Sequence, residues 1–334
     1  MVVKKSKRHN NKSFKLTYFP KIVMRLFFVS LYIVFVLFTV ANIAQAATRI
    51  ADSHIHYNWD HAEIISPEEV VIKLKKARLD LAIVSSTPSH LVLELKKHAG
   101  DWLVPFFSPY IHEMGKNDWY LNEDVIGQVE AGLRQDLYAG IGEIHFTAGF
   151  PPRPHNKIFL QLMTLAKQYN VPALIHVDAG NEKFFLNICQ QHPDINIQFA
   201  HAGGNLFPSH INTVLETCPR VWIDLSARDP WRYDGLTGKN GHLKKPWRNL
   251  MLRYPDRFII GTDPVWRVTR TQSWDLPDEG WDHFEQLLQY HLHWLRDLPD
   301  AVQSKILWEN TAKLLKHPLN PSNTQHESKG LNQK

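Results

Sequence analysis

Two histidines, His54 and His56, stand one residue apart in the stretch "ADSHIHYNWD". Residues i and i+2 of a β-strand point to the same face, so both imidazoles can face one side if this stretch is a strand. Two imidazoles held together suit a first-row divalent metal. A single pair of this kind is weak evidence for a metal site. It gains weight only if other potential ligands in the chain can reach the same place.

Ionisable side chains also end several later apolar runs. They are Glu143 and His145 in "AGIGEIHF", His176 and Asp178 in "PALIHVD", His201 in "INIQFAHAG" and Asp263 in "RFIIGTDP". His176 and Asp263 could complete a set of nitrogen and oxygen ligands with the first pair and leave one position for water. The ordered set predicts a metal centre, whereas each member alone would be read as a structural hydrogen-bonding residue.

The apolar runs indicate the fold that would position these residues. Eight runs rich in Val, Ile and Phe alternate with amphipathic stretches between residues 49 and 316, and the stretch 66–79 opens with a Ser-Pro start and Glu69 of a capping box. Apolar strands alternating with helices predict a parallel sheet, and eight units over about 260 residues match an α/β fold of the (β/α)8 TIM barrel type. An open doubly wound sheet is the alternative, but no glycine-rich phosphate turn follows the first run.

Five segments carry a resemblance to a known family. "DSHIHY", "GIGEIHF", "PALIHVDAG", "FAHAGG" and "IIGTDP", in this order, resemble the amidohydrolase superfamily, most closely its amidohydrolase-related (amidohydrolase 2) group. "KILWENTAKLL" resembles the closing helix of that group, with Thr311 where alanine is commoner. The resemblance covers residues 49–316. It implies a metal-dependent hydrolase that uses a metal-activated water on an amide, ester or lactone bond of a small-molecule substrate.

The resemblance also implies roles for individual residues. His54, His56 and His176 resemble metal ligands. Asp263 resembles the aspartate of strand eight that binds the metal and takes the proton from its water. His201 resembles the histidine of strand six that either polarises the substrate or, in two-metal members, binds the second ion. Asp263 and His201 are therefore the expected catalytic residues.

Glu143 decides the expected number of metal ions. Many superfamily members place a bridging carboxylate on strand four, and "GIGEIHF" is also similar to the TatD-type nucleases. With Glu143 and His201 as ligands a second ion could be held. Because "FAHAGG" is more similar to the mononuclear group, one Zn²⁺ is the expectation, with two if Glu143 bridges. Otherwise Glu143 would orient a ligand histidine.

Other residues are candidates for the rim of the site. Arg228, Trp266 and Arg267 are predicted to bind substrate or to belong to the solvated rim. Asp178 either contacts His176 or caps the following helix. His145 either lines the pocket or is a hydrogen-bonded histidine of the barrel mouth. The tryptophans of residues 229–247 and 266–281 would form a lid or pack their loops.

Three other functions remain open at this point. A nonoxidative decarboxylase would use the same metal site with carboxylate-binding cations. A TatD-like phosphoesterase or nuclease would need Glu143 between two metals and a basic groove. An inactive barrel would act as a binding protein. The chain has a formal charge of +5, but residues 1–46 carry eight Lys and Arg and no acid, which leaves −3 for the remainder. This balance counts against a nucleic-acid partner.

The amino-terminal region resembles an export signal. A basic start, the apolar run "LFFVSLYIVFVLFTV" and the small-residue site Ala44-Gln45-Ala46 predict a signal peptide over residues 1–46 with cleavage after Ala46. An uncleaved membrane anchor is the alternative, and Met24 would open a leader of ordinary length. The protein is therefore expected in the periplasm or outside the cell. The predicted barrel covers residues 47–316, and the polar tail 317–334 is predicted to be disordered.

Two further expectations concern cysteines and assembly. Cys189 and Cys218, the only cysteines, lie at the ends of predicted helices with no metal-type spacing. Although an exported protein can form a disulfide, we expect two thiols. Barrels that resemble this group commonly pair, so a homodimer is also an expectation.

Overall fold

The computed structural model describes residues 49–113, 115–178, 180–265 and 280–316, all within one compact unit, Arg49–Lys334. The predicted signal segment, the predicted disordered tail, and Trp266 and Arg267 lie outside the described residues.

Eight strands follow one another along the chain, and each pairs in parallel with the next within two ladders, β1 to β3 and β4 to β8. They coincide with the eight apolar runs. The strands are β1 Ala51–His56, β2 Leu81–Ser85, β3 Leu103–Phe106, β4 Ile141–Thr147, β5 Ala173–Asp178, β6 Ile197–Phe199, β7 Val221–Asp224 and β8 Phe258–Ile259.

Backbone hydrogen bonds join the two ladders at both seams. Between β3 and β4, the Phe107 N–H donates to the Gly140 carbonyl at 2.9 Å, and the Gly142 N–H donates to the Phe107 carbonyl at 2.8 Å. Between β8 and β1, the Ser53 N–H donates to the Ile260 carbonyl at 2.9 Å. The sheet is therefore a closed barrel, and the predicted (β/α)8 fold is confirmed.

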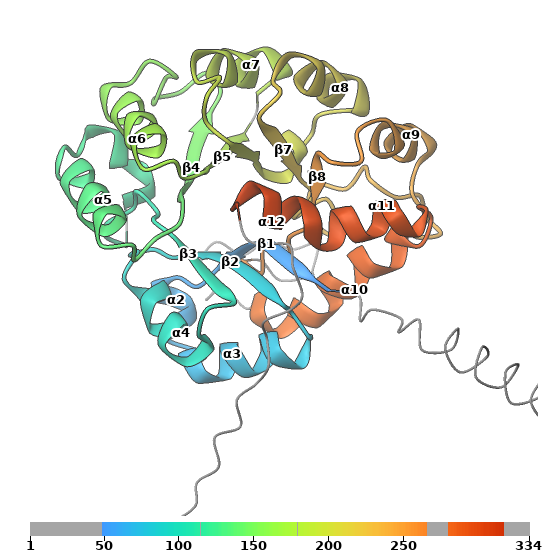
Figure 1. Ribbon diagram of the computed structural model, residues 1–334, viewed down its shortest axis with the longest axis horizontal. Coiled ribbons are helices and arrows are strands. Elements are labelled where there is room, and N and C mark those ends of the chain that lie inside the picture. The colour runs from blue at the N-terminus through green and yellow to red at the C-terminus, as the bar shows by residue number, and fades with distance from the viewer. Residues whose placement is uncertain (1–48, 114, 179, 266–279, 317–334) are drawn as a thin grey trace, which may run out of the picture. The chain divides into compact units, whose positions relative to one another are not determined.

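Helices form an outer ring around the strands (Figure 1). The predicted capping box is present, because the Ser66 hydroxyl accepts from the Glu69 N–H and the Glu69 carboxylate accepts from the Ser66 N–H. None of the helices in the described part of the chain combines the length and apolarity needed to cross a membrane. The α-helices are α2 Trp59–Ala62, α3 Pro67–Lys76, α4 Leu91–Ala99, α5 Asp124–Arg134, α6 Lys157–Gln168, α7 Glu182–Gln191, α8 Pro208–Thr217, α9 Lys245–Arg253, α10 Phe284–Leu295, α11 Asp300–Ser304 and α12 Asn310–Leu314.

The carboxyl-terminal helices close one end of the barrel. A π-helical turn, Lys305–Glu309, links α11 to α12, and these elements lie beside β1 and β8 (Figure 1). The Asn310 side-chain amide donates to the carbonyls of Pro255 and Phe258, next to the start of β8. Trp308 packs with interior strand residues such as Phe106 and Leu174. This apolar end, the floor of the barrel, holds the amino-terminal ends of the strands, so polar side chains at the other end converge on an open mouth.

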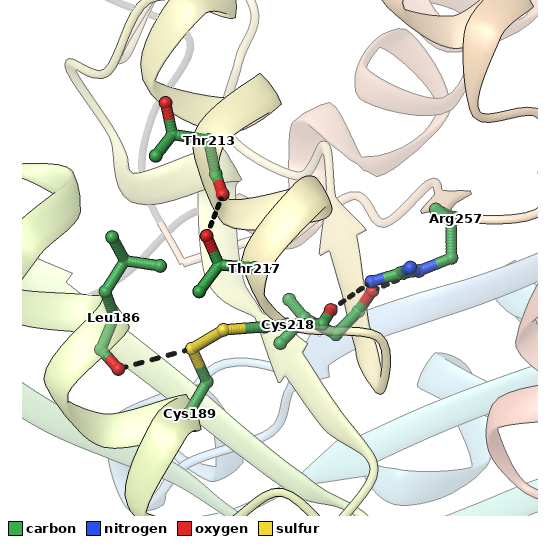
Figure 2. The surroundings of a disulfide bond; sticks show 7 residues. Leu186, Cys189, Thr213, Thr217, Cys218 and Arg257 are labelled. Carbon is green, nitrogen blue, oxygen red and sulfur yellow. Dashed lines mark hydrogen bonds between the residues drawn. A yellow bond between two sulfur atoms is a disulfide. The ribbon is translucent and has the colours of Figure 1, made fainter.

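The two cysteines form a disulfide, so the expectation of two thiols is wrong (Figure 2). Cys189 belongs to the end of α7, and Cys218 directly follows α8. The two residues are 29 apart in sequence, and their Cα atoms are 6.2 Å apart. Consecutive helices of the barrel end side by side at the floor, and a separation of about one β/α unit places both cysteines at matching positions there.

Candidate metal centre

The first strand carries its two histidines to one place, as the alternation predicts. The Nε2 atoms of His54 and His56 are 3.0 Å apart at the mouth end of β1. His54 is almost fully buried and His56 is partly exposed. Both imidazoles therefore face the barrel interior rather than opposite sides of the sheet.

His201 and Asp263 reach the same place from turns, not from strands. β6 ends at Phe199, and His201 lies in the 3₁₀ turn Ala200–Gly203 with φ of +56°. Asp263 lies beyond β8 with φ of +47°. Left-handed φ values are uncommon for residues with a side chain and are concentrated at functional sites. The prediction that each residue ends its strand is corrected, while the prediction that they join the cluster is confirmed by the contacts below.

Glu143 lies at the centre of the cluster. Its buried carboxylate is within 3.5 Å of a ring nitrogen from each of five histidines, and three of these histidines stand on strands other than its own. The distances are 3.0 Å to His176 Nδ1, 3.2 Å to His145 Nε2, 3.3 Å to His56 Nε2, and 3.5 Å to both His54 Nε2 and His201 Nε2.

The outer nitrogen of each of the five rings is held by a different partner. This arrangement sets the orientation of every ring and leaves the inner nitrogen directed at Glu143. The outer contacts are His54 Nδ1 to Asp224 Oδ2 at 2.6 Å, His56 Nδ1 to Ser85 Oγ at 3.0 Å, His145 Nδ1 to Tyr110 Oη at 2.7 Å, His176 Nε2 to Asp178 Oδ1 at 2.8 Å, and His201 Nδ1 to Ser226 Oγ at 2.9 Å. Histidine ligands of metals characteristically have their second nitrogen held in this way.

The cluster is charged although it is buried. Burial alone would raise the pKa of Glu143, but the surrounding imidazoles, led by His145 and His54, hold it well below its usual range. Burial also opposes protonation of His176, yet Glu143 and Asp178 raise its pKa to about 9. A metal-binding imidazole must be neutral, so a metal entering this centre would displace a proton from His176.

Asp263 is ionised for a related reason. Burial disfavours its carboxylate, but His54, His201 and Arg232 together lower its pKa. Burial lowers the pKa of His201, which keeps its ring neutral. Asp263 Oδ1 is buried and has no hydrogen-bond partner among the described residues. A carboxylate oxygen left without a donor in a buried centre is what a metal ion or an ordered water would satisfy.

The strand-one and strand-eight ends are tied together by Asp52. Its carboxylate accepts hydrogen bonds from the His54 N–H at 3.1 Å, the Thr262 N–H at 3.0 Å and the Thr262 hydroxyl at 2.6 Å. A Cβ at Gly261 would lie 2.6 Å from the His54 Cβ, so only glycine allows this close approach. Burial raises the pKa of Asp52 to about 7.

Sequence reasoning missed several residues of the site. Asp224 ends β7 in "VWIDLSA", and the rule that selected the other strand-end residues would have found it. Tyr110 and Ser226 carry no comparable signal, because a hydroxyl beyond a strand is common. Arg232 is bound by Asp229 at 2.6 Å and donates to the carbonyls of Thr262 and Asp263, an arrangement that depends on the loop after β7.

The structure also shows the surroundings of the other predicted residues, Asp178, His145 and Arg228. Asp178 contacts His176, and the cap of α7 is Asn181, so the alternative of a capping role for Asp178 is wrong. His145 is both hydrogen-bonded and part of the cluster. Arg228 is only 3% exposed, so it does not belong to a solvated rim. Its Nη2 donates to the Leu206 carbonyl at 3.4 Å, and its guanidinium carbon lies 5.0 Å from the Trp247 ring centre.

The ligand atoms form groups of the size that a metal requires. In each of three groups, three atoms lie within 4.8 Å of one another, and the residues are either histidine or a carboxylate. Imidazole nitrogen and carboxylate oxygen are ligands that zinc and similar ions accept. The groups are His54, His56 and Asp263; Glu143, His145 and His176; and His54, His201 and Asp224.

Solved structures with the same fold are numerous, and three illustrate the likeness. An amidohydrolase from Burkholderia multivorans is 13% identical with a TM-score of 0.53, covering 81% of this chain and 100% of that one. An uncharacterized TIM-barrel protein from Bordetella bronchiseptica is 12% identical with a TM-score of 0.53, covering 80% and 99%. A mutant of a PTE-like lactonase from Deinococcus radiodurans is 16% identical with a TM-score of 0.53, covering 81% and 96%. At these identities the likeness concerns the fold.

Family membership rests on the sequence. No curated protein matches the chain significantly. The profile of the amidohydrolase family matches residues 127–316, more than half of the chain, including Glu143, His176, His201 and Asp263. Together with the histidine and carboxylate groups at the barrel mouth, this match accounts for a divalent-metal centre and a small-molecule substrate. The chain therefore belongs to the amidohydrolase family and is a metal-dependent hydrolase.

Proposed function

We propose that the cluster around Glu143 is the active centre of an exported hydrolase that cleaves a lactone, ester or amide bond. One observation carries this proposal: five imidazoles have their outer nitrogens held and their inner nitrogens directed at one buried carboxylate. A structural cluster would need only mutual hydrogen bonds. Here more ring nitrogens face Glu143 than the roughly four lone-pair sites of one carboxylate can serve.

The primary metal would be held by His54, His56 and Asp263, and His176, which faces the same Glu143 oxygen as His54, is the further expected ligand; zinc is our choice for the ion. The unpartnered Asp263 Oδ1 and the paired Nε2 atoms of β1 support this assignment. When bound, such an ion lowers the pKa of a water molecule and polarises the carbonyl oxygen under attack. The other contributions come from side chains of the chain itself.

Asp263 is the proposed proton acceptor. Its lowered pKa keeps the carboxylate ionised at neutral pH, and Arg232 holds its main chain and reaches its Oδ2 at 3.5 Å. Asp263 would take a proton from the attacking water and deliver it to the leaving group. Arg232 is a positioning residue, because it acts through Asp263.

His201 is the proposed partner of the developing oxyanion. Ser226 contacts its Nδ1, so the Nε2 side of the ring is directed into the centre. The Ser226 carbonyl accepts from Nδ1 at 3.1 Å, and the Ser226 hydroxyl donates to Asp224, so Nδ1 carries the hydrogen of the neutral ring and Nε2 would donate to the oxyanion once it takes up a proton. A fixed donor aimed at the oxygen that gains charge stabilises the transition state.

Arg228 is the proposed contact for an anionic group of the substrate. Its Nε and Nη1 are buried without a hydrogen-bond partner among the described residues. Gly235 leaves room for the guanidinium, since a Cβ there would lie 2.9 Å from Nη2. A buried cation that lacks a counter-charge is costly, and a substrate carboxylate would offset that cost. Trp266 and Arg267 stay predictions for substrate contact.

Export is part of the proposal. The small-residue site at Ala44-Gln45-Ala46 behind an apolar run supports a cleaved signal peptide, with a periplasmic or secreted product. The Cys189–Cys218 disulfide supports the same location, because disulfides persist mainly in oxidising compartments.

The decisive experiment combines metal analysis with a substrate panel of lactones, esters, amides and phosphodiesters. We expect purified protein to contain a divalent transition metal and to hydrolyse a carbon–oxygen or carbon–nitrogen bond. His54→Ala with His56→Ala should remove both properties while the circular dichroism spectrum is unchanged. His98→Ala, a matched exposed histidine paired with Glu68, should remove neither. Failure of the wild type to bind any added metal would contradict the proposal, and release of carbon dioxide would select the decarboxylase instead.

A further inference from the structure

Tyr233 is a phenol at the barrel mouth that the proposed mechanism does not use. It lies in the loop after β7, and its hydroxyl donates to Asp178 Oδ1 at 3.0 Å, at the end of β5. Its ring centre is 5.4 Å from that of His201, in the turn beyond β6. Because β6 lies between β5 and β7 in the sheet, the side chain reaches past His201 to a residue two strands away. Burial and the neighbouring Asp178 carboxylate raise the pKa of Tyr233, so the hydroxyl keeps the proton that it donates.

A capped turn sets the position of Tyr233. The buried Asp229 carboxylate accepts from the main-chain N–H of Arg232 at 3.1 Å, and the Tyr233 N–H donates to the Ala227 carbonyl at 3.0 Å. A Cβ at Gly204 would lie 3.0 Å from the Tyr233 ring, so the ring packs closely over this glycine. The ring is therefore held by contacts that do not involve its hydroxyl.

Asp178 is held in place by the Tyr233 hydroxyl. The Asp178 side chain is 44% exposed, although it contacts the buried His176. An exposed carboxylate can turn toward solvent, and holding it in one orientation costs side-chain entropy. One oxygen, Oδ1, both lies 2.8 Å from His176 Nε2 and accepts from Tyr233. The phenol on its other side keeps this oxygen against the imidazole.

The orientation of Asp178 determines which nitrogen of His176 is available to the centre. A carboxylate beside Nε2 keeps a hydrogen on that nitrogen, as the outer partners of metal-binding histidines do. Nδ1, which lies 3.0 Å from Glu143 Oε1, is then the nitrogen that can bind an ion. Any residue that fixes Asp178 therefore also fixes the ring of His176.

We propose that Tyr233 is a positioning residue of the active centre, which holds the His176 ring through Asp178. The inference rests on the proposed function, in which His176 is a ligand of the metal. The contacts from Tyr233 to Asp178, from Asp178 to His176 and from His176 to Glu143 are 3.0, 2.8 and 3.0 Å long. The phenol has one hydrogen and Asp178 accepts it, so Tyr233 acts on the centre through this carboxylate and not through the substrate.

The test measures metal affinity and kinetics in the same variants. Metal-free protein is titrated with Co²⁺, and binding is followed by calorimetry and by the visible absorption of the bound ion. Tyr233→Phe should lower both the affinity for Co²⁺ and kcat by about 10-fold, while Asp178→Ala should lower them by about 10- to 100-fold. KM should be unchanged in Tyr233→Phe, because the phenol does not touch the substrate.

A double variant identifies the route of the effect. If Tyr233 acts through Asp178, Tyr233→Phe has nothing left to remove in Asp178→Ala, so the double variant should bind Co²⁺ as weakly as Asp178→Ala alone. Tyr254→Phe is the matched control, because the Tyr254 hydroxyl also contacts a carboxylate, that of Glu216, at 3.5 Å in the outer ring of helices. This control should keep the wild-type affinity and kcat.

Three outcomes would overturn the inference and leave the proposed function standing. Wild-type affinity for Co²⁺ in Tyr233→Phe would show that the phenol does not hold His176. A raised KM with unchanged affinity would place the phenol on the substrate. Losses that multiply in the double variant would show that Tyr233 does not act through Asp178. A wild type that binds no metal would end both the inference and the proposed function.

Discussion

The two ends of the barrel bury different kinds of side chain: the floor buries apolar residues, and the mouth buries ionisable ones. At the floor, Trp308 and Leu314 of the carboxyl-terminal segment pack against Leu81 and Phe106 of the strands, and the contacts are apolar. At the mouth, β1, β4, β5 and β7 end in or near imidazoles and carboxylates, most of them buried. Burying apolar side chains stabilises a fold, whereas burying ionisable groups is costly unless they are paired or bind a metal. The comparison indicates that the floor serves stability and the mouth serves chemistry.

The strongest test of this division removes a charge at the mouth without changing its shape. Asp263→Asn should lower kcat by roughly 10²- to 10⁴-fold, because the amide cannot accept the proton. The melting temperature should fall less than in the floor variant below, because the amide keeps the shape of the side chain and loses only the charge interactions that lower the pKa of Asp263. The assay is steady-state kinetics on protein whose metal content is measured in parallel. A variant that keeps both its metal and a kcat within tenfold of the wild type would remove Asp263 from the reaction.

The converse change belongs at the floor. Trp308 is 5% exposed and packs with the interior of the strands, while Arg49 stacks on its ring at 3.3 Å. Trp308→Ala should lower the free energy of unfolding by roughly 3–5 kcal/mol, with no change in metal stoichiometry or KM. Urea unfolding measures the loss, and Trp308→Phe is the matched control with a smaller one. Loss of metal binding in a folded Trp308→Ala protein would show that floor and mouth are not separate.

The disulfide tests a covalent contribution at the same end. Cys189→Ser with Cys218→Ser should lower the free energy of unfolding by about 2–4 kcal/mol, because the unfolded chain is no longer closed over 29 residues. Activity and metal content should be those of the wild type. The control is reductant, which should shift the urea midpoint of the wild type and leave the double variant unmoved. Equal midpoints for both proteins without reductant would contradict the prediction.

The sequence predicted the strands and most of the cluster because both depend on local order. Apolar runs mark buried parallel strands, and the residue that ends each run lies at the mouth by the geometry of the fold. His54, His56, Glu143, His145 and His176 could be selected for this reason. Asp224, the last residue of β7, follows the same rule.

The rest depends on contacts between segments that carry no local signal. The Asp229–Arg232 pair reaches Asp263 only because the loop after β7 folds toward the end of β8. The disulfide requires that α7 and α8 end at the same level along the barrel axis. Neither helix has a sequence feature that predicts this alignment. The run "INIQFAHAG", which includes Asn196 and Gln198, predicts a strand that reaches His201, but the strand stops at Phe199 and a turn begins.

A histidine outside the cluster offers the finest test of the comparison. His291 on α10 is buried, and its Nδ1 accepts from the Trp294 indole at 3.2 Å. Burial lowers its pKa to about 4, despite the negative charge of Asp229 nearby, whereas Glu143 and Asp178 raise that of His176 to about 9. Two equally buried imidazoles thus differ in charge because only one has carboxylates against its ring nitrogens.

This difference predicts acid sensitivity at His291. Its pKa is about 6.5 in the unfolded chain and lower in the folded one, so between these values the unfolded state binds more protons and stability falls as pH falls. The loss should reach about 2 kcal/mol at pH 5 relative to pH 7. His291→Gln keeps an acceptor for the indole and cannot titrate, so it should lack this part of the loss. Urea unfolding of EDTA-treated protein at both pH values measures it, and parallel losses in both proteins would mean that His291 is not held neutral by its surroundings.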